Sequence, residues 1–221
     1  MLQYILDIDR SLLLWINSLH TALGDVFMPI YTDKLLWMPL YLFLVYYLFK
    51  SYGKRAWWIL LVFLLCVGCA DFVSSSILKP WVARPRPSQV SELEGVVHIV
   101  NGYKSGRFGF VSSHAANTMV VATLFTLLTR DTLNSVVLYM WCILNCYSRI
   151  YLGVHYPGDI LGGILVGGII AVVGYSFLLK KYPGHHELSP QFNAINRWGI
   201  ASIWLLLVGA TLTYSLVRTI L

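Results

Sequence analysis

The stretch Trp57-Trp-Ile-Leu-Leu-Val-Phe-Leu-Leu-Cys-Val-Gly-Cys-Ala70 carries no charged side chain, and half of the residues that follow it to Leu78 are apolar. A helix over residues 57–78 would be long enough to cross the hydrocarbon core of a bilayer, which is about 30 Å thick. In lipid, every backbone N–H and C=O group needs a partner, and a helix supplies these partners within its own segment. This stretch therefore predicts a membrane-spanning helix.

The rest of the chain has the same character. Of the 221 residues, 57% are hydrophobic and 12% are charged, so the chain has more apolar surface than a soluble domain of this size can bury. Glycines in one apolar run, Gly163, Gly167 and Gly168 among them, are expected to let helices pack closely. We interpret residues 1–221 as one domain, an all-α integral-membrane bundle of six transmembrane helices over residues 35–49, 57–78, 114–129, 135–152, 159–179 and 198–217.

The N-terminal 22 residues have a different pattern. Polar side chains at helical spacing lie opposite a wide Leu, Ile and Trp face, which predicts an interfacial helix lying on the membrane. The alternative is a ragged first span, but charged residues near the middle of the segment would be costly in hydrocarbon. The polar face is expected to hold Gln3, Asp7, Arg10 and Asn17.

Charges in the loops give the orientation. One face, with the connections 50–56, 130–134 and 180–197, carries a clear excess of Lys and Arg over acidic residues. On the other face the cations are balanced by acids or belong to the clusters described next. The positive-inside rule then places the first face in the cytoplasm and residues 79–113 outside. We expect a bacterial inner-membrane protein with a periplasmic site, membrane lipids as partners and no nucleic acid.

Three polar clusters fall on the outer face. They are Lys79-Pro-Trp-Val-Ala-Arg-Pro-Arg86-Pro87, Phe110-Val-Ser112-Ser113-His114-Ala-Ala-Asn117 and Ser148-Arg149-Ile-Tyr-Leu-Gly-Val-His155-Tyr-Pro-Gly-Asp159. Fixed Lys and Arg side chains bind tetrahedral anions, and serines before a helix add hydroxyl and free N–H groups. A pair of histidines supplies a nucleophile and an acid, and a carboxylate can fix the tautomer of one of them. The clusters together predict phosphate chemistry.

The clusters resemble the signatures of the type 2 phosphatidic acid phosphatase superfamily, and within it the bacterial membrane lipid phosphatases. The first matches KX6RP and the third matches SRX5HX3D without a gap. The middle signature, usually PSGH, reads Val111-Ser112-Ser113-His114, so a serine replaces the glycine and narrows the phosphate cradle. The signatures lie within residues 79–159, in the family's order.

The resemblance implies a role for each matching residue. His155 would attack phosphorus, Asp159 would orient it, and His114 would protonate the leaving group and later activate water. The resemblance also implies a metal-independent reaction without a cofactor. The phosphoryl oxygens would be held by Lys79, Arg86, Ser112, Ser113 and Arg149.

Two functions are compatible with these residues. The first is a phosphatase for a lipid phosphate or diphosphate, acting through a phosphohistidine, with undecaprenyl diphosphate, phosphatidylglycerol phosphate and lipid A phosphates as candidate substrates. The second is a non-catalytic lipid-head-group binder or flippase with a degenerate site. Retention of both histidines and Asp159 favours the phosphatase, since binding alone needs only the cations. Soluble vanadium haloperoxidases share the pocket but not the apolar composition.

Residues outside the clusters have other expected roles. The segment 88–110, with Tyr103, Lys104, Arg107 and Phe108, is expected to cap the pocket. Asp71 is expected to form a helix–helix hydrogen bond. We predict that changing any one of the remaining histidines leaves turnover within a few-fold of the parent in a phosphate-release assay. These control residues are His20, His98, His185 and His186.

Overall fold

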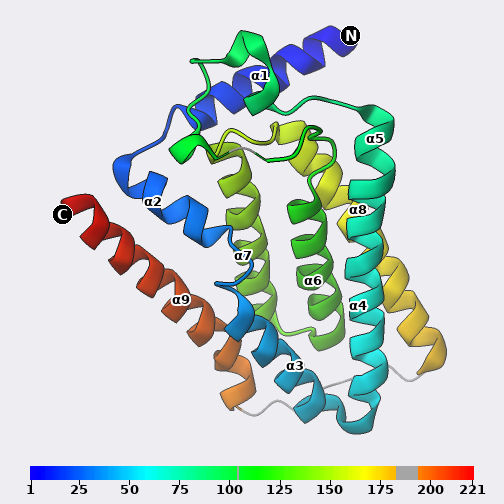
Figure 1. The fold of residues 1–221 in the computed structure, drawn as a ribbon. Coiled ribbons are helices and arrows are strands. Elements are labelled where there is room, and N and C mark those ends of the chain that lie inside the picture. Colours follow the sequence, from blue (N-terminus) through cyan, green and yellow to red (C-terminus); the bar gives the residue numbers. More distant parts are fainter. Residues whose placement is uncertain (104, 183–193) are drawn as a thin grey trace.

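The computed structural model describes residues 1–103, 105–182 and 194–221, and in this part of the chain every regular element is helical (Figure 1). Five 3-10 or π-helical stretches join or extend the helices. The α-helices are α1 (Leu2–Asn17), α2 (Ala22–Tyr31), α3 (Met38–Tyr52), α4 (Ala56–Phe72), α5 (Lys79–Val82), α6 (Ser113–Thr129), α7 (Thr132–Tyr151), α8 (Pro157–Lys181) and α9 (Ala194–Ile220).

Helix α6 is the centre of the bundle and packs against α4, α7 and α8. Helices α3 and α9 lie beside each other, and α2 packs against α7 and α9. Helix α1 lies across one end of the bundle, where α5, the start of α8 and the connection 83–112 also lie (Figure 1). The turns between α3 and α4 and between α6 and α7 lie at the opposite end, as the alternation of loops predicted.

Glycines make the contact between α6 and α8 possible. A Cβ atom on Gly163 would collide with the carbonyl oxygen of Ser112, and one on Gly167 would collide with the carbonyl oxygen of Ala116. These backbones approach more closely than any larger residue would allow. The expected packing role of the glycines is thus confirmed for these two positions. It also fixes the start of α6 beside α8.

Each of the six predicted spans coincides with a helix. By length and composition, three stretches could cross a membrane: Met38–Val82, which includes the turn at Gly53–Arg55, Pro157–Lys181 and Trp198–Ile220. The second span is longer than predicted, because α4 continues through a π-helical stretch, Val73–Leu78, into α5. Helix α2 was not predicted. The expected interhelical hydrogen bond of Asp71 is present, with Asn117 Nδ2 donating to Asp71 Oδ1 over 3.3 Å.

The predicted N-terminal helix is present as α1, but its faces differ in part from the prediction. Side chains on the outer side of α1 are exposed and largely apolar, including Ile5, Leu12 and Trp15. Asn17, which we had assigned to the outer polar face, is buried together with Asp9 and Leu13, each four residues from the next. The inward face therefore carries polar groups, because they find hydrogen-bond partners within the protein.

The α6–α8 contact gives a matched pair of variants. Gly167→Ala should lower the melting temperature of the purified protein in detergent, because overpacking of a close contact costs about 1–3 kcal/mol. Gly168→Ala on the next residue should leave it unchanged, since its Cβ would meet only the Met119 methyl group, at 3.9 Å. Equal melting temperatures for the two variants would contradict the close approach of α6 and α8.

Candidate active site

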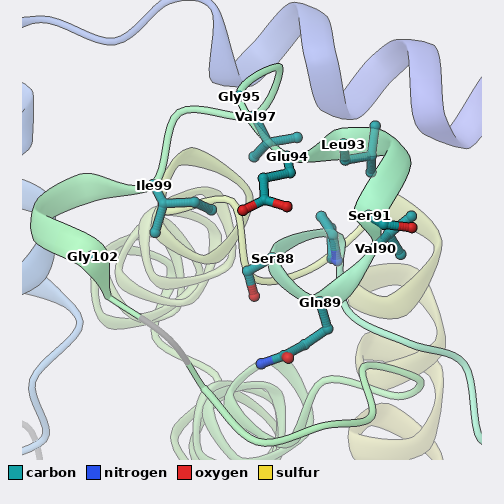
Figure 2. Close-up of a pocket in the computed structure, with 11 residues that line it drawn as sticks. Ser88, Gln89, Val90, Ser91, Leu93, Glu94, Gly95, Val97, Ile99 and Gly102 are labelled. Carbon is teal, nitrogen blue, oxygen red and sulfur yellow. The ribbon is translucent and has the colours of Figure 1, made fainter.

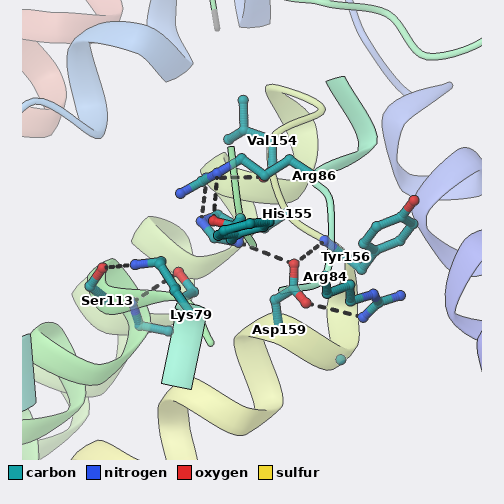
Figure 3. Close-up of polar contacts among 12 residues, drawn as sticks. Lys79, Arg84, Arg86, Ser113, Val154, His155, Tyr156 and Asp159 are labelled. Atoms are coloured by element: carbon teal, nitrogen blue, oxygen red, sulfur yellow. Dashed lines mark hydrogen bonds and ion pairs between the residues drawn. The ribbon is translucent and has the colours of Figure 1, made fainter. Parts of the chain in front are cut away.

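All eight predicted site residues lie at the end of the bundle that α1 crosses. Lys79 opens α5, Arg86 follows α5, Ser112 and Ser113 begin α6, Arg149 lies in the last turn of α7, and His155 and Asp159 flank the start of α8. Figure 3 shows the His155 ring between Arg86 and Asp159, with Lys79 and Ser113 paired beside it. Segments up to 80 residues apart thus meet at one end of the bundle.

The local backbone explains the position of Arg86. Helix α5 ends at Ala83, whose left-handed conformation (φ 50°) reverses the chain. The segment 84–86 then pairs with 107–109 through an isolated antiparallel bridge between Pro85 and Phe108. Arg86 Nε also donates to the carbonyl oxygen of Phe108 over 3.0 Å. These contacts hold Arg86, which is 5% exposed, with its NH1 group next to His155 Nε2.

The two nitrogens of His155 have different partners. Nδ1 lies 3.2 Å from Asp159 Oδ2, and Nε2 lies 2.7 Å from Arg86 NH1. A carboxylate only accepts and a guanidinium only donates, so Nδ1 carries the proton and Nε2 carries the lone pair. The lone pair of Nε2 therefore points toward a cation, which is where an anionic phosphoryl group would bind.

Asp159 is fully buried and has several partners. Tyr156 N donates to Oδ2 over 3.1 Å, and Arg84 NH1 donates to Oδ1 over 3.0 Å. The residue lies in the first turn of α8, where the helix dipole also favours a negative charge. Both oxygens are therefore fixed, and with them the plane of the His155 ring.

Lys79 and the serines form the second part of the site. Lys79 Nζ donates to Ser113 Oγ over 2.6 Å and to Ser75 Oγ over 3.4 Å. Ser112 caps α6 by accepting from Ala115 N, and its own N–H donates to the carbonyl oxygen of Asp159. Ser113, which stands at the position of the usual glycine, thus accepts a hydrogen bond from the Lys79 ammonium group.

The side chains of Arg149 and His114 have surroundings that differ from those of the other six site residues. The Arg149 side chain is buried and donates to Thr32 Oγ1 over 3.0 Å and to Tyr103 OH over 3.4 Å. Its Nε atom is buried and has no hydrogen-bond partner among the described residues. His114, in the first turn of α6, is exposed. The His114 imidazole is therefore accessible, and Arg149 Nε is a buried donor without a partner among the described residues.

The charges around the site favour binding of an anion and keep the His155 imidazole uncharged. Burial lowers the pKa of His155 well below its usual value, and the cations Arg86, Arg149 and Lys79 lower it further. Burial and the neighbouring Arg149 lower the pKa of Arg86 to about 10, so this side chain stays cationic at neutral pH. His155 is thus an uncharged base surrounded by positive charge.

The predicted cap touches the site through Tyr103 and through the pairing of Arg107 and Phe108 with Arg86. Tyr103 lies against Arg149, with the guanidinium 5.4 Å from the centre of its ring. A cavity of about 410 Å3 lies inside the cap, between Pro87 and Gly102, and includes none of the eight site residues (Figure 2). Lys104, another predicted cap residue, lies outside the described residues, as do the control residues His185 and His186.

The control residues His20 and His98 form a separate cluster. With Asp25 they are the group of potential metal ligands found in the described ranges, with ligand atoms within 4.8 Å of one another. The two rings are stacked at 3.9 Å with an interplanar angle of 11°, so their lone pairs do not converge on one point. His98 Nε2 instead bonds to Asp25 Oδ2 over 2.8 Å. The cluster links the cap to α2.

Three neighbours of the site were missed. Arg84 had been noted in the first cluster but not as the partner of Asp159, and Asp9 and Thr32 had no assigned place. The spacing of arginines in Arg84-Pro-Arg86 could have suggested two functional guanidinium groups. Nothing in the sequence around Asp9 or Thr32 indicates which distant residue each contacts.

Comparison with known proteins shows the family to which the chain belongs. The sequence profile of the PAP2 superfamily matches residues 55–183, a range that contains all eight site residues. The chain belongs to the PAP2 superfamily. The resemblance inferred from the three clusters is therefore confirmed.

Among curated PAP2 relatives, the lipid A 4'-phosphatase of Bacteroides thetaiotaomicron is 39% identical over 170 residues, covering 76% of each chain. The lipid A 4'-phosphatase of Porphyromonas gingivalis is 35% identical over 211 residues, covering 91% of this chain and 89% of the relative. The crystal structure of a transmembrane PAP2-type phosphatidylglycerolphosphate phosphatase from Bacillus subtilis superposes with a TM-score of 0.60, at 20% identity, over 80% of this chain and 87% of that one. Together with the stretches that are long and apolar enough to cross a membrane, these PAP2 relatives identify the chain as an integral membrane protein.

The pairing of Lys79 with Ser113 yields a test of the altered PAP2 signature. Lys79→Met should lower kcat about 100-fold or more, as loss of one donor to a transition-state oxyanion does. Ser113→Gly, which restores the usual glycine, should keep kcat within a few-fold, because it frees the ammonium group for phosphate. Both are measured by phosphate release in detergent. A large loss of kcat in Ser113→Gly would show instead that the hydroxyl stabilises the transition state.

Proposed function

We propose that the protein is a metal-independent lipid phosphatase that removes a phosphate group from lipid A or a closely related lipid phosphate. The contact that carries this proposal is the Asp159–His155–Arg86 chain, which leaves the Nε2 lone pair of a neutral imidazole facing cations. The choice of lipid A over the other candidates rests on the two lipid A 4'-phosphatases, whose similarity extends over three quarters or more of the chain.

The proposed reaction has two steps. The Nε2 lone pair of His155 attacks phosphorus, the bond from phosphorus to the lipid oxygen breaks, and His114 gives its proton to that oxygen. Water then attacks the phosphohistidine, His114 takes a proton from this water, and inorganic phosphate leaves. Lys79, Arg86, Ser112, Ser113 and Arg149 hold the phosphoryl oxygens throughout. For this to occur, the Arg86 guanidinium must exchange its bond to Nε2 for one to a phosphoryl oxygen.

An apolar groove supports a lipid as the substrate. A groove of about 400 Å3 runs between α3, α4 and α6 and is lined by apolar residues such as Leu44, Phe63 and Val121. Its polar lining includes Asn117, which lies one helical turn from His114 on α6, and Lys34. A lipid alcohol protonated by His114 could place its acyl chain in this groove, with its head group at the level of the catalytic residues.

The membrane arrangement is part of the proposal. We place six crossings, at α3, at α4 with α5, and at α6, α7, α8 and α9, in a single domain of residues 1–221. Helices α6 and α7 are not among the stretches that could cross a membrane by length and composition alone, but α6 is enclosed by its neighbours and need not face lipid along its length. With the Lys- and Arg-rich loops in the cytoplasm, the site lies on the periplasmic side of the bacterial inner membrane.

Phosphate release from purified protein in detergent, with a chelator present, tests the reaction. The parent should release inorganic phosphate from a lipid A substrate, and His155→Ala should release none above background. A His155→Ala variant as fast as the parent would exclude the phosphohistidine, and turnover that needs added metal would exclude the metal-independent reaction. Binding of lipid without any hydrolysis would favour the head-group binder or flippase.

The same assay on other lipids tests the substrate. Lipid A, undecaprenyl diphosphate and phosphatidylglycerol phosphate should be compared at equal mole fraction in the same detergent. We expect the highest kcat/KM for lipid A. A higher value for either of the others would reassign the substrate while leaving the phosphatase reaction intact.

The groove makes a separate prediction. Val121→Trp, which fills the groove, should raise KM for the lipid substrate and leave hydrolysis of a small water-soluble aryl phosphate unchanged. Ile143→Trp, at an exposed position on α7, is the matched control and should change neither. Equal KM values for lipid in Val121→Trp and in the parent would exclude the groove as the acyl-chain site.

A further inference from the structure

Arg84 bridges two carboxylates that come from opposite parts of the chain. Its NH1 lies 3.0 Å from Asp159 Oδ1, and its NH2 lies 2.7 Å from Asp9 Oδ2 (Figure 3 shows the Asp159 side). Exposure is 18% for the Arg84 side chain, 0% for Asp159 and 11% for Asp9. An ion pair this deeply buried requires well-placed partners, because isolated buried charges are strongly unfavourable.

Arg84 and Asp9 each have a further contact besides the ion pairs. The Arg84 guanidinium lies over the Tyr156 ring at 3.9 Å from its centre, a cation–π contact that fixes its plane. The second oxygen of Asp9 accepts a hydrogen bond from Gly158 N over 2.7 Å. Asp9 thus binds both Arg84 and the N-terminal end of α8, one residue before Asp159.

We propose that Arg84 is a positioning residue for the His155–Asp159 pair, and that Asp9 of α1 completes this support. The inference rests on the proposed phosphatase reaction. The described contacts of Arg84 do not include His155; it acts through the Asp159 carboxylate, whose Oδ1 it holds while Oδ2 faces His155 Nδ1. Helix α1 is therefore part of the catalytic unit as well as a membrane-surface helix.

The geometry explains why both residues are needed. With Oδ1 held, the carboxylate cannot rotate about its Cβ–Cγ bond, and the His155 ring keeps the orientation that presents Nε2. Reacting groups must be held to within about 10–20° for full activity. Without Arg84, the carboxylates of Asp9 and Asp159, which both lie beside Gly158, would repel each other. Without Asp9, the Arg84 guanidinium would lose the partner that orients its NH1 and NH2 groups.

A purely structural role is the alternative, in which the bridge only attaches α1 to the bundle. A structural role and a positioning role predict different effects on stability and on kcat. Loss of attachment would lower stability and the amount of folded enzyme, with kcat per folded molecule unaltered. Loss of positioning lowers kcat of the folded enzyme while KM changes little, because the phosphate-binding cations remain in place.

The test uses Arg84→Gln, Asp9→Asn and the double variant in detergent, with kcat normalised to the monodisperse folded fraction. We expect Arg84→Gln to lower kcat about tenfold or more, as loss of a residue that orients a catalytic group commonly does. Asp9→Asn should lower it by less, and the double variant should match Arg84→Gln alone, because both changes disrupt one network. Asp7→Asn, an exposed acid on the same helix, is the matched control and should match the parent.

A fourth variant keeps every charge. Gly158→Ala would bring its Cβ to 2.8 Å from Asp9 Oδ2 and displace that carboxylate. It should lower kcat as Asp9→Asn does, which keeps the test decisive even if Arg84→Gln does not fold. Parental kcat in folded Arg84→Gln, or in both Asp9→Asn and Gly158→Ala, would overturn the inference, as would additive losses in the double variant. Failure of the proposed function would look different, since the parent itself would release no phosphate or His155→Ala would be fully active.

Discussion

The Asp159 carboxylate is buried at the start of α8, and a charge in that position is tolerated only if it is surrounded by donors. Four groups supply them or face it: Tyr156 N, Arg84, the His155 ring and the N-terminal end of the helix. These same contacts fix the tautomer and direction of His155. The catalytic geometry that we propose is thus a consequence of stabilising one buried charge.

Much of the surrounding structure serves this arrangement. Small residues let α8 lie against α6 so closely that Ser112 N reaches the carbonyl oxygen of Asp159. The bridge between Pro85 and Phe108 brings the NH1 group of Arg86 next to His155 Nε2. Helix α1 turns Asp9 and Asn17 toward the bundle, where they are buried and have hydrogen-bond partners, while apolar side chains such as Trp15 are exposed on its outer side.

The sequence was informative where the chemistry is local. His155 and Asp159 are four residues apart at a helix start, so their contact follows from spacing, and the cation clusters follow from the alternation of apolar runs. The inward face of α1 could not be predicted, because Asp9 and Asn17 are buried only through contacts with residues about 75 to 149 positions away. The second helix is longer than predicted because it continues past Leu78 through α5, where Lys79 and Pro80 end the apolar run that hydropathy follows. That Ser113 would bind Lys79 was also unpredictable, since it requires the start of α6 to lie beside α5.

Direct detection of the phosphorylated residue tests the central claim most sharply. If His114 activates the water of the second step, a His114→Gln variant given an aryl phosphate, whose leaving group needs no acid, should accumulate the intermediate. Rapid quenching in base followed by mass spectrometry should then find an acid-labile phosphate on His155. Phosphate on another residue, or turnover by this variant with no phosphorylated protein at any time point, would contradict the account.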